Sequence, residues 1–141
     1  MTTLSATHPT VFPTQSLRRS RVAGIALWTT QILVAGMFLY AGTAKLTGDP
    51  SMVALFEAVG VGQWLRYATG TIEAVSALAL IVPSLAAFGA LLLIPTMVAA
   101  VATHLFILGG TPAPAMVLLI GSIAIAWARR DQLTGALSTK H

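Results

Sequence analysis

Residues 74–128 read AVSALALIVPSLAAFGALLLIPTMVAAVATHLFILGGTPAPAMVLLIGSIAIAWA, a run of 55 residues without Asp, Glu, Lys or Arg. One helix needs only about 20 apolar residues to cross a bilayer, so this run is long enough to cross more than once. Backbone groups in lipid must be satisfied internally, which leaves helices and closed barrels. Barrel strands alternate polar and apolar residues, and the stretch ALALIV at 77–82 does not. The run therefore predicts membrane-spanning helices.

The composition of the whole chain agrees with this prediction. Of 141 residues, 56% are hydrophobic and only 9% are charged, and the mean hydropathy is +0.84. A soluble domain has about 25% charged residues, and this length fits one domain. The net charge of +4 comes from basic residues spread between the ends of apolar segments. We therefore do not expect a nucleic-acid partner, which would need a basic patch.

The chain contains no cysteine. Disulfides, Cys-x-x-Cys redox exchange, thiolate metal sites and cysteine nucleophiles are therefore excluded within this chain. A redox role would need a quinone, another bound cofactor or a partner subunit.

The apolar segments predict four membrane spans, at about 22–44, 65–82, 85–108 and 114–128. Between the first two spans, Asp49, Pro50 and Ser51 have the pattern of a helix start. The apolar residues that follow have helical spacing and end at Gly60, which is too short a segment to cross a bilayer. The predicted fold is an all-α integral membrane four-helix bundle with a short interfacial helix between the first and second spans.

The predicted domain organisation is a disordered cytoplasmic tail (1–17), a four-helix transmembrane domain (18–130) and a cytoplasmic tail (131–141). Four spans place both termini on one side of the membrane. Six basic residues lie on that side and two on the other: Arg18, Arg19, Arg21, Arg129, Arg130 and Lys140 against Lys45 and Arg66. The positive-inside rule then predicts a multi-pass protein of the bacterial plasma (inner) membrane with both termini in the cytoplasm.

Charged groups inside a span cost about 2.5–3.5 kcal/mol each on insertion scales, so such groups are candidate functional residues. Glu73 lies near the middle of the second span. Arg66 is two helical turns before it, and Gly70 lies between them on the same face, where it leaves room for a helix or a ligand.

The other candidates lie in the first and third spans. His104 is about one turn from the outer end of the third span, and Met97 lies on its face. Lys45 ends the first span. All these residues belong to the outer half of the bundle, so a cluster of Lys, Arg, Glu and His is a geometrically reasonable prediction.

Two interpretations of these residues remain open. In the first, Glu73 and His104 are catalytic groups that handle protons, and a ligand is bound by Lys45, Arg66, Gly70 and Met97. In the second, an ion-pair network fixes which helices are neighbours, and Lys45 and Arg66 only extend outward to the membrane surface. His104 then bonds a backbone carbonyl, and Met97 is packing. Gln31 is interpreted as an interhelical hydrogen bond. One Glu and one His do not make a metal site, so no metal is predicted.

Several stretches of the sequence form an ordered set of motifs. Residues 36–46 read GMFLYAGTAKL and contain the pattern G-x-x-K-L. The loop FEAVGVGQWLRY (56–67) and the segment GTIE (70–73) follow, and the third predicted span contains TMVAA (96–100) and THLF (103–106). In this order the stretches resemble the first-helix signature, the loop and the later helices of the DoxX-like family of small membrane proteins. The resemblance covers about residues 22–128.

The resemblance implies a compact four-helix membrane bundle. Some DoxX-like proteins are linked to thiosulfate:quinone oxidoreduction and others to membrane complexes that handle oxidative stress. The resemblance therefore implies a quinone as the expected ligand. No covalent cofactor is expected. If the chain has an activity, the resemblance implies a role as a component of a membrane oxidoreductase.

The leading hypothesis is a quinone- or lipophilic-ligand-binding component of a membrane redox assembly. Its expected partners are the lipid bilayer, membrane or redox subunits, and further copies of the chain. A non-catalytic scaffold subunit of a membrane complex is the first alternative, and a small oligomeric transporter is the second.

Overall fold

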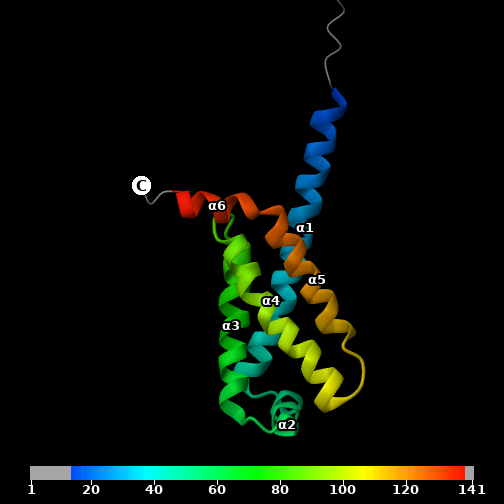
Figure 1. The fold of residues 1–141 in the computed structure, drawn as a ribbon, viewed down its shortest axis with the longest axis vertical. Helices are drawn as coiled ribbons and strands as arrows, with labels where there is room; N and C mark the ends of the chain where they lie inside the picture. The colour runs from blue at the N-terminus through cyan, green and yellow to red at the C-terminus, as the bar shows by residue number, and fades with distance from the viewer. Residues whose placement is uncertain (1–13, 139–141) are drawn as a thin grey trace, which may run out of the picture.

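A computed structural model describes residues 14–138, with side chains described from 21 to 134. All the regular structure in these residues is helical (Figure 1). The elements in order are α1 (Thr14–Thr47), α2 (Pro50–Val59), α3 (Gln63–Ile81), α4 (Ala86–Thr103), the π-helix η1 (His104–Leu108), α5 (Ala113–Ala128) and α6 (Arg130–Ser138). The predicted all-α class is confirmed.

The four long helices pack in a closed order, with α1 against α3, α3 against α4, α4 against α5, and α5 against α1. Helix α2 lies across one end of this bundle, next to α3 and η1. Helix α6 runs sideways across the opposite end and contacts α4 (Figure 1). We call these the α2 end and the α6 end.

Two segments are long and apolar enough to cross a membrane, Arg21–Thr47 in α1 and Ala86–Leu108 in α4 and η1. They have 27 and 23 residues, which correspond to about 40 Å and 35 Å of helix and exceed the roughly 30 Å of a hydrocarbon core. Helix α3 has 19 residues but includes two charged ones, and α5 has only 16 residues. The chain thus has two clear candidate spans.

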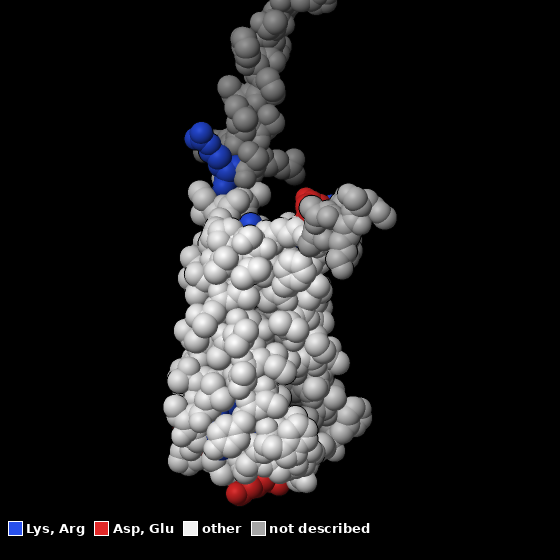
Figure 2. Space-filling model, turned by 90° about the vertical axis from the view of Figure 1, so that its left-hand side faces the viewer, with Lys and Arg blue, Asp and Glu red and all other residues white. Residues whose placement is uncertain are grey.

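The surface of the bundle is apolar, and seven of its fifteen buried apolar side chains are alanines. Ala35, Ala77 and Ala90 are buried where the helices meet, which lets the helices approach closely. Large side chains such as Phe106 (85% exposed) and Trp127 (70% exposed) point outward. Figure 2 shows charged residues at the two ends of the molecule and an uncharged surface between them. Soluble monomers rarely expose an apolar surface of this extent.

The short helix that the sequence predicts between Asp49 and Gly60 is present as α2. Asp49 caps its start by accepting a hydrogen bond from the backbone amide of Ser51 at 2.9 Å. Gly60 ends it in the left-handed conformation, with φ of 76°. Both signals could be read from the sequence because each depends on residues next to one another in the chain.

The two ends of the chain differ from the sequence-based expectation. Helix α1 begins at Thr14, so residues 14–17 of the predicted tail are helical, and residues 1–13 lie outside the described part. In the predicted polar C-terminal tail, α6 forms from Arg130. The Gln132 amide ties α6 to the turn before α4, because its Nε2 donates to the Pro83 carbonyl and its Oε1 accepts from the Ala87 amide at 3.2 Å.

Candidate functional site

A buried ion pair joins α1 to α3. Lys45 Nζ lies 2.6 Å from Glu73 Oε2, and the two side chains are 14% and 2% exposed. Glu73 lies near the middle of α3, and Lys45 lies in the last turn of α1. Among residues 21–134 this is the only salt bridge. A carboxylate so deeply enclosed depends on its one cationic partner.

Glycines bring α1 and α3 into backbone contact beside the ion pair. A Cβ added at Gly42 would lie 2.9 Å from both the carbonyl oxygen of Gly70 and the amide nitrogen of Ala74. A Cβ added at Gly70 would lie 2.9 Å from the Cβ of Lys45. The space that the sequence predicts beside Gly70 is therefore occupied by α1. This close approach lets the Lys45 side chain reach Glu73.

Arg66 ties together three helices near the α2 end. Its Nη1 donates to the backbone carbonyl of Lys45, which lies in the last turn of α1. Its Nε donates to Gln63 Oε1 at 2.6 Å. Gln63 Nε2 in turn donates to the Val53 carbonyl in α2 at 3.0 Å. The guanidinium also lies 4.2 Å from the centre of the Tyr67 ring. Arg66 is buried and held, so it does not extend outward along the surface.

His104 occupies the junction of α4 and η1. Its Nδ1 lies 2.9 Å from the carbonyl oxygen of Ala100 in the preceding turn. In the part of the chain with described side chains, no hydrogen bond or ion pair connects His104 to Glu73. The wider π-helical turn that begins at His104 packs against α2. Such single π-turns occur frequently at functional sites.

The structure thus brings together four of the six predicted site residues, Lys45, Arg66, Gly70 and Glu73. Within the described side chains, no hydrogen bond or ion pair joins His104 to them. Met97 is 4% exposed and belongs to the hydrophobic core. Gln63, which the sequence analysis did not select, joins the cluster. Gln63 and Arg66 are three residues apart on one face of α3, and this spacing is the sequence signal that could have identified Gln63 as a partner of Arg66.

A second buried polar cluster lies toward the α6 end. Gln31 Nε2 donates to the Leu80 carbonyl, the interhelical bond predicted for this residue. Arg129 Nη2 donates to Gln31 Oε1 at 3.2 Å, and its guanidinium lies 5.4 Å from the centre of the Trp28 ring. In the described residues, the Arg129 Nε and the Ser76 Oγ are buried without a hydrogen-bond partner.

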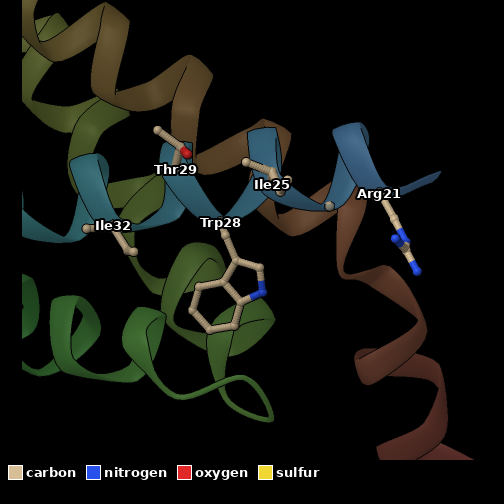
Figure 3. A pocket seen from close by; sticks show the side chains of 6 residues that line it. Arg21, Ile25, Trp28, Thr29 and Ile32 are labelled. Carbon is tan, nitrogen blue, oxygen red and sulfur yellow. The ribbon is translucent and has the colours of Figure 1, made fainter. Parts of the chain in front are cut away.

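Depressions on the described surface of the bundle include the following two. One lies on α1 near the α6 end and is lined by Arg21, Gly24, Ile25, Trp28, Thr29 and Ile32 (Figure 3). The other lies at the α2 end and is lined by Tyr40, Thr43, Ala44, Thr47, Gly48, Asp49 and Pro50. Neither depression includes Glu73 or His104. No group of three His, Asp or Glu residues in the described part of the chain is placed to hold a metal ion.

Helices that are apolar on their exposed faces and polar where they meet are the pattern of helical membrane proteins. The sequence pattern of the DoxX-like family matches residues 29–128, which include all six predicted site residues, and the chain belongs to this family. Comparison with curated proteins and with solved structures gave no match.

Proposed function

We propose that this chain is a four-span protein of the bacterial inner membrane that binds a quinone or a similar lipophilic ring in its outer half, as a component of a membrane redox assembly. One observation carries the proposal. The Lys45–Glu73 ion pair lies enclosed between two helices of an apolar-surfaced bundle.

The proposal that α3 spans the membrane is supported by the directions in which its side chains point. Its polar residues Arg66, Glu73 and Ser76 are buried, whereas its outward face carries Ile72, Val75, Leu78 and Ile81. The average hydropathy of α3 is lowered by residues that would not meet lipid. Its 19 residues correspond to about 28 Å, close to the hydrocarbon thickness.

Helix α5 supports a fourth span by its composition. It has no charged residue and exposes Val117, Ile120 and Ile123. Its 16 residues correspond to about 24 Å, a mismatch that local thinning of the bilayer accommodates at modest cost.

The charges at the two ends favour a cytoplasmic α6 end. Arg21, Arg129 and Arg130 lie at the α6 end, whereas both basic side chains at the α2 end are engaged inside the bundle. The positive-inside rule then places both termini in the cytoplasm and the ion pair in the outer half of the membrane.

Stability alone gives little reason for a buried ion pair. Replacing such a pair by apolar residues of similar size is often neutral, or stabilising by about 1–4 kcal/mol. Function gives a better reason, because a ligand carbonyl could accept a hydrogen bond from the Lys45 ammonium in place of Glu73. Glu73 would then be released to exchange a proton as the ring is reduced or oxidised by a partner subunit.

His104 is the second proposed contact, and its tautomer restricts what it can do. A carbonyl oxygen only accepts hydrogen bonds, so the contact with Ala100 places the proton on Nδ1. In the neutral ring Nε2 is then an acceptor, which suits the hydroxyl of a quinol better than the carbonyl of a quinone. We therefore expect His104 to favour the reduced ligand.

The scaffold alternative is favoured by a specific observation. The ion pair is closely packed, and neither surface depression opens onto it. In a scaffold the pair would only select α1 and α3 as neighbours, and no ligand would enter.

The test is a titration of the purified protein with ubiquinone and menaquinone analogues. We expect Glu73→Gln and Lys45→Met each to lower stability by about 3–5 kcal/mol, because each leaves a buried group unpaired. The double variant Lys45→Met with Glu73→Leu should recover that stability and still fail to bind quinone.

The double variant separates the two functions. If it is stable and binds quinone as well as the wild type does, the pair is structural and the ligand site is elsewhere. If no form binds quinone but the double variant still retains a co-purifying partner, the scaffold function is favoured. His104→Ala should weaken binding of the quinol more than binding of the quinone.

A further inference from the structure

We propose that the depression on α1 near the α6 end binds an anionic phospholipid, with an acyl chain along α1 and the phosphate at Arg21. This inference depends on the membrane insertion and orientation given under the proposed function, but not on quinone binding.

The depression follows one face of α1. Its lining residues are three or four positions apart along the helix, so they lie on one face: Arg21, then Gly24 and Ile25, then Trp28, then Ile32. Figure 3 shows Arg21 at one end of this row of side chains and Ile32 at the other. One end is therefore cationic and the rest is apolar, the same order of polarity as in a phospholipid.

Gly24 keeps the floor of the depression open. No atom lies within 4 Å of the position that a Cβ at Gly24 would take. Ile25 and Ile32 are 68% and 58% exposed, so their side chains stand beside the depression without packing into the bundle. A flexible acyl chain fits such a shallow apolar depression on a surface that already faces lipid.

The cations at this end have no acidic partner in the described residues. Arg21, Arg129 and Arg130 form no salt bridge there, although Asp131 lies in the same segment. Arg129 stacks on Trp28, whose ring lines the depression, so a second guanidinium lies close to the site. Guanidinium groups bind phosphate oxygens through paired hydrogen bonds.

The occupant is a membrane lipid and not a soluble phosphate, because most of the lining is apolar. Trp28 also fits this position, since tryptophan is enriched where the headgroups meet the hydrocarbon. A basic residue near a negatively charged leaflet contributes about 1 kcal/mol to binding.

The experiment is native mass spectrometry of the full chain, gently extracted from vesicles of equal parts phosphatidylglycerol and phosphatidylethanolamine. We expect the wild type to retain phosphatidylglycerol preferentially. Arg21→Gln should lower that preference about fivefold, which corresponds to about 1 kcal/mol. Gly24→Leu should lower the retention of lipid of either kind, because its side chain fills the depression.

Two matched variants serve as controls. Gly36→Leu adds the same side chain to α1 at another open position outside the depression. Arg130→Gln removes the same charge at the same end, from a residue that stacks on Trp127 instead. Gly36→Leu should retain phosphatidylglycerol as the wild type does. Arg130→Gln should lower the preference clearly less than Arg21→Gln does, because it loses only the general attraction to an anionic leaflet and no hydrogen bond to the bound phosphate.

Three results would overturn the inference: equal retention of the two lipids by the wild type, test variants that behave like their controls, or displacement of the lipid by inorganic phosphate. These outcomes are independent of the quinone titration, which probes the opposite half of the bundle. A protein that binds quinone but shows no lipid preference would refute the lipid site alone.

Discussion

At the scale of single residues, the environment of Glu73 is set by its neighbours on α1. Lys45 provides the one cation, and Gly42 with Gly70 provides the close approach that allows the 2.6 Å contact. An isolated carboxylate in an apolar interior would be costly, so ion pairing and helix packing must form together.

Gly42→Ala tests how much this close approach matters. The added methyl would meet backbone atoms of α3 at 2.9 Å, and backbone cannot move aside as a side chain can. We expect a loss of about 1–3 kcal/mol, the range for an overpacked core. The measurement is reversible unfolding in detergent.

Gly36→Ala is the control, because no atom lies within 4 Å of its added Cβ. A Gly-to-Ala change inside a helix normally stabilises by about 0.5–1 kcal/mol, and we expect this variant to follow that rule. If Gly42→Ala is equally stable, then α1 and α3 are not in backbone contact at this point.

The residues of the site were predictable to different degrees. Arg66, Gly70 and Glu73 share a face of one helix, so spacing alone aligned them correctly. His104 lies one turn from the end of the third helical segment, as predicted, but position along a helix does not fix the direction in which a side chain points. Its contact with Ala100 lies within its own helix, and a sequence cannot show which partner a histidine chooses.

At the scale of elements, the mean hydropathy of α3 does not identify it as a span, although the directions of its side chains are those of a membrane helix. Its charged residues face inward, and it exposes the aliphatic residues Ile72, Val75, Leu78 and Ile81, whereas a soluble amphipathic helix turns its charged residues outward. Hydropathy averaged along the chain does not record direction. The sequence analysis identified the helix as an apolar segment at about 65–82, and its observed bounds are Gln63–Ile81.

The N-cap of α2 gives a pH-dependent prediction. Hydrogen bonds from the Ser51 hydroxyl and backbone amide hold the pKa of Asp49 below its ordinary value. The group therefore stabilises α2 above its unfolded pKa of about 3.9, and this contribution is lost as pH falls through the lowered folded pKa. Amide exchange at Val53, corrected for its intrinsic rate, should speed up below about pH 4.

Asp49→Asn is the control for this effect. It keeps an oxygen that accepts the capping hydrogen bond but does not titrate. Protection of α2 in this variant should not change between pH 6 and pH 3. If it falls as in the wild type, another group controls the helix.

Helix α6 could not be predicted from local pattern in the way that α2 was. Its residues are polar and suggest a tail, and its position depends on Gln132 reaching the turn between α3 and α4. That contact joins residues more than forty positions apart in the chain. Such contacts depend on the packed bundle.

At the scale of the whole molecule, the face drawn in Figure 2 is largely uncharged between its charged ends, and the Lys45–Glu73 ion pair lies inside the bundle. Polar side chains inside the bundle are mostly paired, and large apolar side chains cover its outside. The composition made the class of protein predictable. The number of crossings is a separate question. Two helices qualify clearly as spans, whereas α3 depends on which way its side chains face and α5 on its short length.

Labelling of single cysteines with a membrane-impermeant maleimide tests the central claim most directly. The chain has no cysteine of its own, so each substitution introduces a unique thiol. With four spans and cytoplasmic termini, Glu57→Cys and Gly110→Cys should react in intact cells, whereas Ser84→Cys should react only after permeabilisation. If only α1 and α4 cross, Ser84→Cys would react from outside and Gly110→Cys would be protected, and the four-span account would be contradicted.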